Sequence, residues 1–150
     1  MIEIVCGEPI SSAYTMGFET GEDLSQWVVI NANGDANTGG NANTWGLYDF
    51  SGAPQGAHGG DNVAGYFYND DATTAADDWI ITGCLDLVAG ANYTMSYWWS
   101  TGDGYDETME IFVGNDQTVA AMTQSIQNLG TVQDNAWNEE IINFTVPSSG

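Results

Sequence analysis

The chain is organised around the stretch from Asn31 to Trp45, which reads N-A-N-G-D-A-N-T-G-G-N-A-N-T-W. Almost all of its residues are Asn, Asp, Gly, Ala or Thr, so it has no apolar face to bury and is predicted to be a loop. Side chains with oxygen atoms recur at alternate positions, at Asn31, Asn33, Asp35 and Asn37. This spacing is typical of a loop that turns oxygens towards one calcium ion. The alternative is a polar surface loop that Asx turns stabilise, because Asp35 is its only carboxylate.

Strand patterns lie on both sides of this loop. The apolar run Trp27–Ile30 precedes it, and the aromatic run Trp45–Phe50 follows it. Alternating apolar and polar residues predict further strands; these cover residues 14–18, 63–68, 78–82, 84–87, 93–100, 109–113 and 137–146. Many short strands with Gly, Asn and Asp turns predict an all-β fold, an antiparallel β-sandwich of the jelly-roll type over residues 1–150.

One segment has a different period. In Gln117 to Leu129, the apolar residues Val119, Met122, Ile126 and Leu129 fall near helical spacing. This pattern predicts a helix, and a crossover rich in loops is the alternative.

The charge of the chain excludes two classes of partner. The 150 residues include no Lys or Arg, 21 acidic residues and one His. Such a chain has no positive surface for nucleic acid or for anionic lipid. Each carboxylate must be solvated, hydrogen-bonded by neutral donors, or neutralised by a bound metal ion, and the third possibility favours Ca²⁺.

The two cysteines, Cys6 and Cys84, are far apart and belong to no metal-binding Cys pair. In an extracellular protein they are expected to form a disulfide that ties the N-terminal extension, residues 1–13, to a strand in the middle of the chain. Two buried free thiols are the alternative. We expect no signal peptide in the sequence, because the first residues lack a basic start and a long apolar run, and no stretch is long enough to span a membrane.

Four features in order resemble the cleaved-adhesin or choice-of-anchor domains, which are MAM-like jelly rolls of bacterial secreted surface proteins. The features are Phe18-Glu19, Gln26-Trp27, the Asn31–Trp45 loop and the segment 77–83 (D-D-W-I-I-T-G). The resemblance covers residues 17–146. It implies a secreted, extracellular module at the cell surface that acts in cell adhesion and holds structural calcium. The loop of the family is richer in Asp, so the Asn residues here lower the expected metal affinity.

The resemblance also implies further strands after the final V-P-S-S-G of this sequence. The sandwich is therefore expected to be incomplete at the C-terminus. Either the chain is cut short, or a neighbouring chain supplies the strand, as in a fibre or filament.

Candidate binding residues follow from these expectations. In the family that the chain resembles, strand ends converge with the acidic loop, which makes a pool of metal ligands, not all at one ion: Glu19, Asn33, Asp35, Asp61 and Asp78. Aromatic rings that stack on sugars indicate a carbohydrate-binding platform, with packing of the rings in the fold as the alternative; its residues are Tyr48, Tyr66, Tyr68, Trp98 and Tyr105.

Catalysis is not expected. His58 is isolated in a Gly-rich loop, and no Ser-His-acid order accompanies it. The carboxylate doublets lie on adjacent residues, which point to opposite faces of a strand and do not form the opposed pair of a glycosidase. The sequence therefore predicts a non-catalytic, calcium-stabilised adhesion or assembly module whose partners are other copies, other surface proteins or glycans. A filament subunit and a carbohydrate-binding module are the alternatives.

Overall fold

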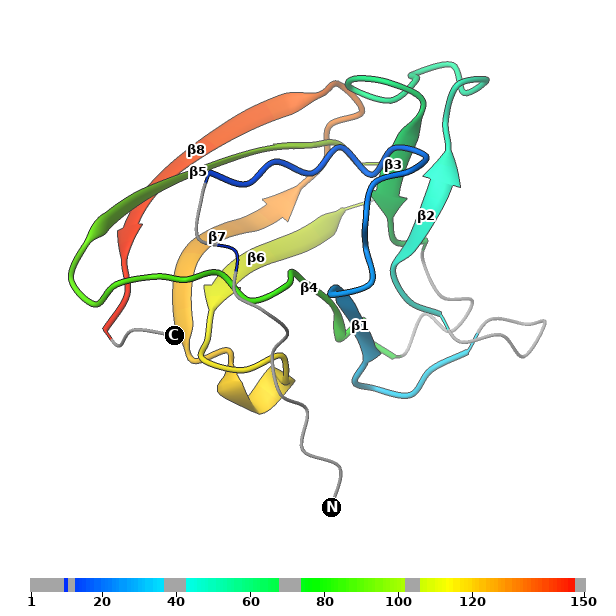
Figure 1. Cartoon of the computed structure of the whole chain (residues 1–150). Helices are drawn as coiled ribbons and strands as arrows, with labels where there is room; N and C mark the ends of the chain where they lie inside the picture. The colour runs from blue at the N-terminus through cyan, green and yellow to red at the C-terminus, as the bar shows by residue number, and fades with distance from the viewer. Residues whose placement is uncertain (1–9, 11–12, 37–42, 68–73, 102–105, 148–150) are drawn as a thin grey trace. The chain divides into compact units, whose positions relative to one another are not determined.

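A computed structural model describes residues 10, 13–36, 43–67, 74–101 and 106–147. Within them the protein is all-β: eight strands pair antiparallel in four two-stranded sheets, and the one helical turn is the 3₁₀ segment η1 (Val119–Ala121) (Figure 1). The described residues form two compact units, residues 13–84 and residue 10 with residues 85–147. The predicted all-β antiparallel class is confirmed. The jelly-roll sandwich and its extent as a single domain stay predictions.

The first unit contains two short sheets. Strand β1 (Val28–Asn31) pairs with β4 (Asp78–Ile81), and β2 (Gly46–Asp49) pairs with β3 (Asn62–Gly65). Ile81 is 8% exposed and sits opposite Val28 in the ladder. The indole Nε1 of Trp45 donates a hydrogen bond to the carbonyl of Asp78 (3.1 Å), which joins the start of β2 to the start of β4.

An aromatic cluster holds the segment before β1. The Trp27 ring meets Phe18 edge-on at a centroid distance of 5.3 Å, and its Nε1 donates to the Tyr14 hydroxyl at 2.8 Å. Residues 14–18 form no strand, contrary to the sequence pattern. The aromatic residues of this segment, Tyr14 and Phe18, pack their rings against Trp27 instead, and the left-handed backbone at Phe18 (φ 63°) ends any extended conformation at the last residue of the segment.

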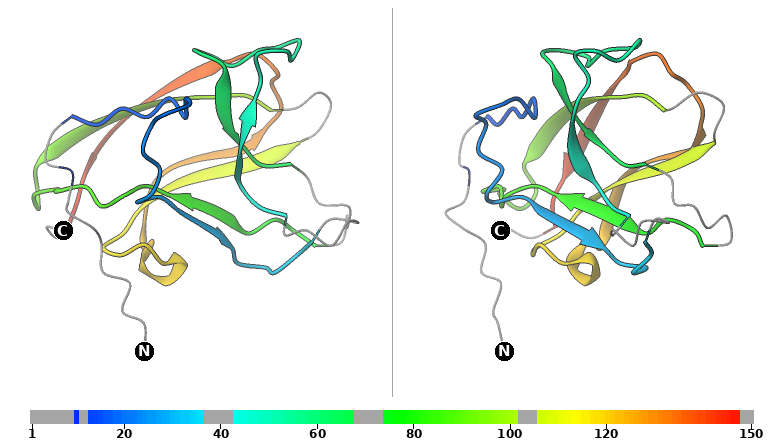
Figure 2. Two further views of the ribbon diagram at one scale, coloured as in Figure 1. Left: turned by 45° about the vertical axis from the view of Figure 1, so that its right-hand side comes forward. Right: turned by 90° about the vertical axis from the view of Figure 1, so that its right-hand side faces the viewer.

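The second unit contains two longer ribbons. Strand β5 (Asn92–Trp99) pairs with β8 (Asn138–Thr145), and β6 (Glu107–Val113) pairs with β7 (Gln124–Val132). Both ribbons keep their two strands side by side in the two views of Figure 2. Burial alternates along β5, with Tyr93, Met95, Tyr97 and Trp99 turned inwards. The period of two arises because successive side chains of a strand point to opposite faces.

A hydrogen-bonded relay connects the inner face of the β5–β8 ribbon to β7. The Tyr97 hydroxyl donates to Gln127 Oε1 (2.9 Å), and Gln127 Nε2 donates to Glu140 Oε2 (2.8 Å). Burial and the charge of Glu140 raise the pKa of Tyr97 to about 12. Tyr97 therefore stays a neutral donor, and these side-chain hydrogen bonds tie the β5–β8 ribbon to the β6–β7 ribbon.

The predicted helix over residues 117–129 is wrong. Only η1 is helical there, and β7 begins at Gln124. The register of β6 with β7 shifts twice, which leaves Ile126 and Leu129 as extra residues without a partner opposite them. Each β-bulge inserts one residue and displaces the alternation by one position. Two bulges three residues apart therefore reproduce the spacing of one face of a helix.

The expected strand over residues 84–87 is reduced to one bridge, in which Leu85 pairs in parallel with Ile10. In the part of the chain that the structure describes, no helix has both the length and the apolar character that crossing a lipid bilayer requires.

Candidate functional site

The Asn/Asp loop is fixed by its first residue. Asn31 Nδ2 donates to the carbonyls of Asp35 (2.8 Å) and Asn43 (3.1 Å), and Asn31 Oδ1 accepts the backbone N–H of Gly34 (2.6 Å). The side chain of Asn31 thus connects the two ends of the loop. Its oxygen closes a turn at the start of the loop, and the Asx turn that the alternative interpretation predicts lies at Asn33, whose Oδ1 accepts the N–H two residues on.

Asn33 has a similar role. Its Nδ2 donates to the carbonyl of Ala75 (2.8 Å), and its Oδ1 accepts the N–H of Asp35 (3.3 Å). The bond to Ala75 ties the loop to the segment before β4. Asn31 and Asn33 therefore shape the loop in this structure. Asn37 lies outside the described residues.

Asp35 and Asp78 form the acidic centre of the loop region. Asn31 stands opposite Asp78 in the β1–β4 ladder, which places the start of the loop beside this carboxylate. Both oxygens of Asp78 are buried, and neither accepts a regular hydrogen bond in the described part of the chain. Burial raises the pKa of Asp78, and the charges of Asp35 and Asp77 raise it further, whereas the nearby Thr44 hydroxyl and the Asp77 backbone N–H lower it. The Thr44 Oγ1 is itself buried without a regular hydrogen bond.

The end of the loop covers this centre. Asn43 is 6% exposed, and its Nδ2 donates to the Tyr66 hydroxyl (3.0 Å) and, at 3.5 Å, to Asp35 Oδ2. Asn43 and Thr44 were not among the residues predicted from the sequence. They belong to the same polar run as Asp35, and this place in the sequence is the only feature that could have identified them as candidates.

The chemistry of this centre suits a hard cation. Two carboxylates and a hydroxyl offer oxygen atoms, which are the ligands that calcium prefers, and the nearby Asn43 Nδ2 donates only a long hydrogen bond to Asp35. The chain has no Lys or Arg to neutralise a buried carboxylate. Among the described residues no three His, Cys, Asp or Glu side chains gather as metal ligands, so neutral oxygens would complete the shell around any ion there.

Glu19 and Asp61 belong to a different contact. Glu19 Oε1 accepts the backbone N–H groups of Asp61 and Asn62, both at 3.1 Å. The carboxylate of Glu19 thereby holds the loop that leads into β3, and the Asp61 side chain is exposed. The structure therefore brings together Asp35 and Asp78 of the predicted pool, with Asn33 shaping the loop, and it places Glu19 on the backbone before β3.

Replacing Gly60 with Ala tests this contact. Gly60 has φ +74°, and a Cβ atom there would collide with the Glu19 carboxylate. We expect Gly60→Ala to lower the free energy of unfolding by about 2–3 kcal/mol, through left-handed strain and loss of the charged hydrogen bonds. Chemical denaturation measures this value.

The control for this prediction is Gly56→Ala in the same loop. Gly56 also has a positive φ (+69°), but a Cβ there would meet nothing within 4 Å. This variant is expected to lose only the strain, about 1 kcal/mol. Equal losses in the two variants would show that the Glu19 contact adds nothing to stability.

The described aromatic candidates have different contacts, and the carbohydrate-binding platform stays a prediction. Tyr48 packs edge-on to Phe67 (4.6 Å) and lies over the glycine pair of β2 and β3, Gly46 and Gly65. Tyr66 accepts the hydrogen bond from Asn43. Trp98 is 42% exposed on β5, in the other unit. Tyr68 and Tyr105 lie outside the described residues.

Cys84 is disulfide-bonded. Cys6, the other cysteine of the chain, lies outside the described residues, as does most of the N-terminal extension, so the pairing stays a prediction. His58 is exposed in its Gly-rich loop.

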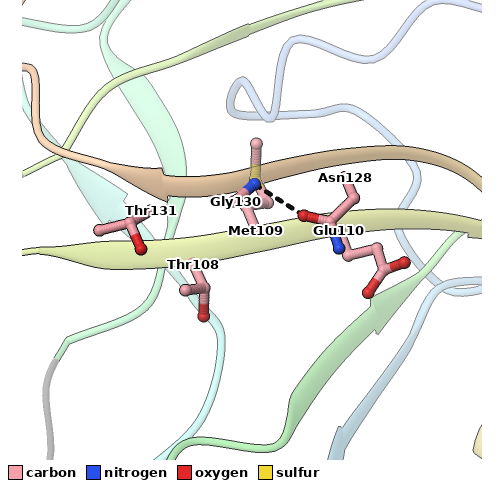
Figure 3. Close-up of a pocket in the computed structure, with 6 residues that line it drawn as sticks. All are labelled: Thr108, Met109, Glu110, Asn128, Gly130 and Thr131. Carbon is pink, nitrogen blue, oxygen red and sulfur yellow. Dashed lines mark hydrogen bonds between the residues drawn. The ribbon is translucent and has the colours of Figure 1, made fainter.

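Two surface hollows are lined by residues other than those of the acidic centre. One, of about 390 Å³, lies at a bulge of the β6–β7 ribbon, where Thr108 and Thr131 stand opposite each other and Gly130 N–H donates to Asn128 Oδ1 (2.7 Å) (Figure 3). The other, of about 160 Å³, is almost wholly apolar. Its lining residues are Phe18, Leu24, Trp27, Val29, Gly46, Leu47 and Ile80.

Comparison with known proteins finds no relative of this chain. Protein-family models, curated proteins and solved structures give no match to the chain. The resemblance to cleaved-adhesin domains therefore stays a prediction.

Proposed function

We propose that this protein is a calcium-stabilised, non-catalytic module that serves adhesion or assembly outside the cell, at a bacterial surface. One observation carries the calcium part of the proposal: Asp78 has two buried oxygens without regular hydrogen bonds, next to Asp35. A buried carboxylate is costly unless a donor or a cation compensates it. Because the chain has no Lys or Arg, a bound divalent cation is the simplest compensation.

The adhesive role is supported by features that suit a persistent extracellular module. A chain without Lys or Arg has no cleavage site for trypsin-type proteases, and the disulfide at Cys84 suits an oxidising compartment. The resemblance to surface adhesin domains points to the same setting. None of these features needs a catalytic group, and the proposal includes none.

A filament subunit is the second candidate, and strand pairing favours it. Each sheet in the described residues has two strands, so each of those strands is an edge of its sheet. Edge strands carry backbone groups that a strand from a neighbouring chain can pair with. The acidic charge of each copy opposes such assembly at low salt, so filaments are expected only when calcium screens or bridges the carboxylates.

Calorimetric titration of the purified chain with calcium tests the proposal. We expect saturable binding with a Kd of about 10⁻⁴–10⁻³ M, the range of extracellular modules, because few ligands at the site carry charge. Magnesium is expected to bind more weakly, since it demands a tighter octahedral shell. Asp78→Asn is expected to abolish the heat of calcium binding.

The matched control is Asp86→Asn, which removes the same charge from an exposed position in the other unit. It should leave the calcium titration unchanged. A titration without heat in the unmodified chain, or equal binding by the two variants, would refute a calcium site at Asp78.

A further inference from the structure

The outward face of the β5–β8 ribbon presents apolar surface to solvent. Burial alternates along both strands, so the exposed residues share one face. Opposite residues pair as Thr94 with Asn143, Ser96 with Ile141, and Trp98 with Glu139. We name these six residues the Trp98 face. Two of its large apolar side chains are exposed, Trp98 by 42% and Ile141 by 62%.

The two ends of the Trp98 face differ in chemistry. At one end, Thr94 Oγ1 donates to Asn143 Oδ1 (2.8 Å), so these polar groups bind each other. At the other end, Glu139 stands directly across from Trp98, where opposite Cβ atoms lie about 4.5–5.5 Å apart. Ile141 is the diagonal neighbour of Trp98, within reach of a long side chain.

An indole, a carboxylate and an aliphatic side chain at such spacing match one kind of ligand. A guanidinium or ammonium group is attracted to the face of an indole within about 6 Å, and it forms a charge-assisted hydrogen bond with a carboxylate. The methylene stem of Arg or Lys packs on aliphatic surface while its head stays hydrated. Trp98, Glu139 and Ile141 supply these three contacts.

The charge of the chain decides between possible occupants. A second copy has no Lys or Arg to place on Glu139 and carries the same formal charge of −21. A neutral sugar gains nothing from this field, whereas a basic segment is attracted and steered by it. We therefore propose that the Trp98 face binds a basic segment of a partner protein, with an Arg or Lys side chain over the indole and against the Glu139 carboxylate. The inference rests on the proposed adhesive function and gives the chemistry of its partner.

Binding of fluorescently labelled peptides to the full chain in calcium tests this proposal. The probe is a ten-residue peptide in which Arg alternates with apolar residues, and its control replaces each Arg with Gln. We expect the Arg peptide to bind, with an affinity that falls as the salt concentration rises. The Gln peptide is expected to bind at least about tenfold more weakly.

Three variants locate the site. Trp98→Ala should weaken Arg-peptide binding by about three- to tenfold, and Trp98→Phe by less, because Phe keeps an aromatic face. Glu139→Lys should weaken it more than tenfold by repulsion, and this exposed position tolerates the change even if Trp98→Ala unfolds. Glu110→Lys, on the exposed side of β6, is the charge-matched control and should leave binding within about twofold.

Binding that none of the Trp98-face variants weakens would overturn the proposal. Preference for a neutral oligosaccharide over the Arg peptide, lost in Trp98→Ala, would replace it with a sugar site. Calcium titration of the same samples separates the two proposals: peptide binding without calcium binding refutes the calcium site alone, and the reverse refutes the basic partner alone.

Discussion

In excess EDTA, the melting temperature of the chain is expected to be about 5–10 °C lower than in saturating calcium. An ion that binds only the folded state stabilises it by about 2.7 kcal/mol when its free concentration is one hundred times Kd. For a protein of this size, each kcal/mol shifts the melting temperature by about 2–4 °C. Thermal unfolding followed by circular dichroism measures the difference.

Asp78→Asn should remove the effect of calcium on the melting temperature. Without metal, the buried charge of Asp78 next to Asp35 opposes folding, as the raised pKa of Asp78 indicates. Removing that charge is therefore expected to raise the melting temperature in EDTA by about 1–3 °C and to abolish the response to calcium. A variant that is more stable than the original chain without calcium and less stable with it is hard to explain by packing alone.

Asp86→Asn separates this effect from general charge repulsion. With 21 acidic residues, any added cation screens repulsion and stabilises the fold to some extent. Asp86 is exposed and is not a residue of the acidic centre, so its variant should keep nearly the full difference in melting temperature between calcium and EDTA. If magnesium or sodium of equal ionic strength gave the same rise as calcium, the stabilisation would be screening and the specific site would be refuted.

The class of the fold was predictable because its strands keep a simple period. The alternation of residues 93–100 and 137–146 corresponds to β5 and β8, and the apolar runs at 27–30 and 78–82 correspond to β1 and β4. The bulges of β7 were not predictable from periodicity, since an inserted residue gives Ile126 and Leu129 a helical spacing. Pairing between distant strands, such as Asn31 opposite Asp78, leaves no local pattern in a single sequence.

The acidic centre was predictable only in part from the sequence. Asp35 and Asp78 were both candidates, Asp35 from the spacing of the loop and Asp78 from the resemblance. The roles of Asn31 and Asn33 were less accessible, because an Asn side chain serves an Asx turn as readily as it binds a cation. The hydrogen bond from the N–H of Asp35 to Asn33 Oδ1 shows the first use, which a linear pattern cannot distinguish from the second.

Burial alternates along β8, so two neighbouring isoleucines can be compared directly. Ile142 is 7% exposed on the inner face, and Ile141 is 62% exposed on the Trp98 face. We expect Ile142→Ala to lower the free energy of unfolding by about 2–4 kcal/mol, because it removes buried apolar volume and leaves a cavity. Ile141→Ala is expected to lower it by less than about 0.5 kcal/mol, since a surface position away from such features contributes little. Chemical denaturation of both variants measures the two losses under the same conditions.

The same pair separates stability from binding. Ile141→Ala should keep the fold and weaken binding of the Arg peptide. An Ile142→Ala chain that unfolds would lose both the fold and the binding. Equal losses of stability at the two positions would mean that both faces of the β5–β8 ribbon are covered in solution, for example by a strand or sheet of another chain. That result would favour the filament subunit over the module with a free face, because only an occupied outer face makes Ile141 as costly to truncate as Ile142.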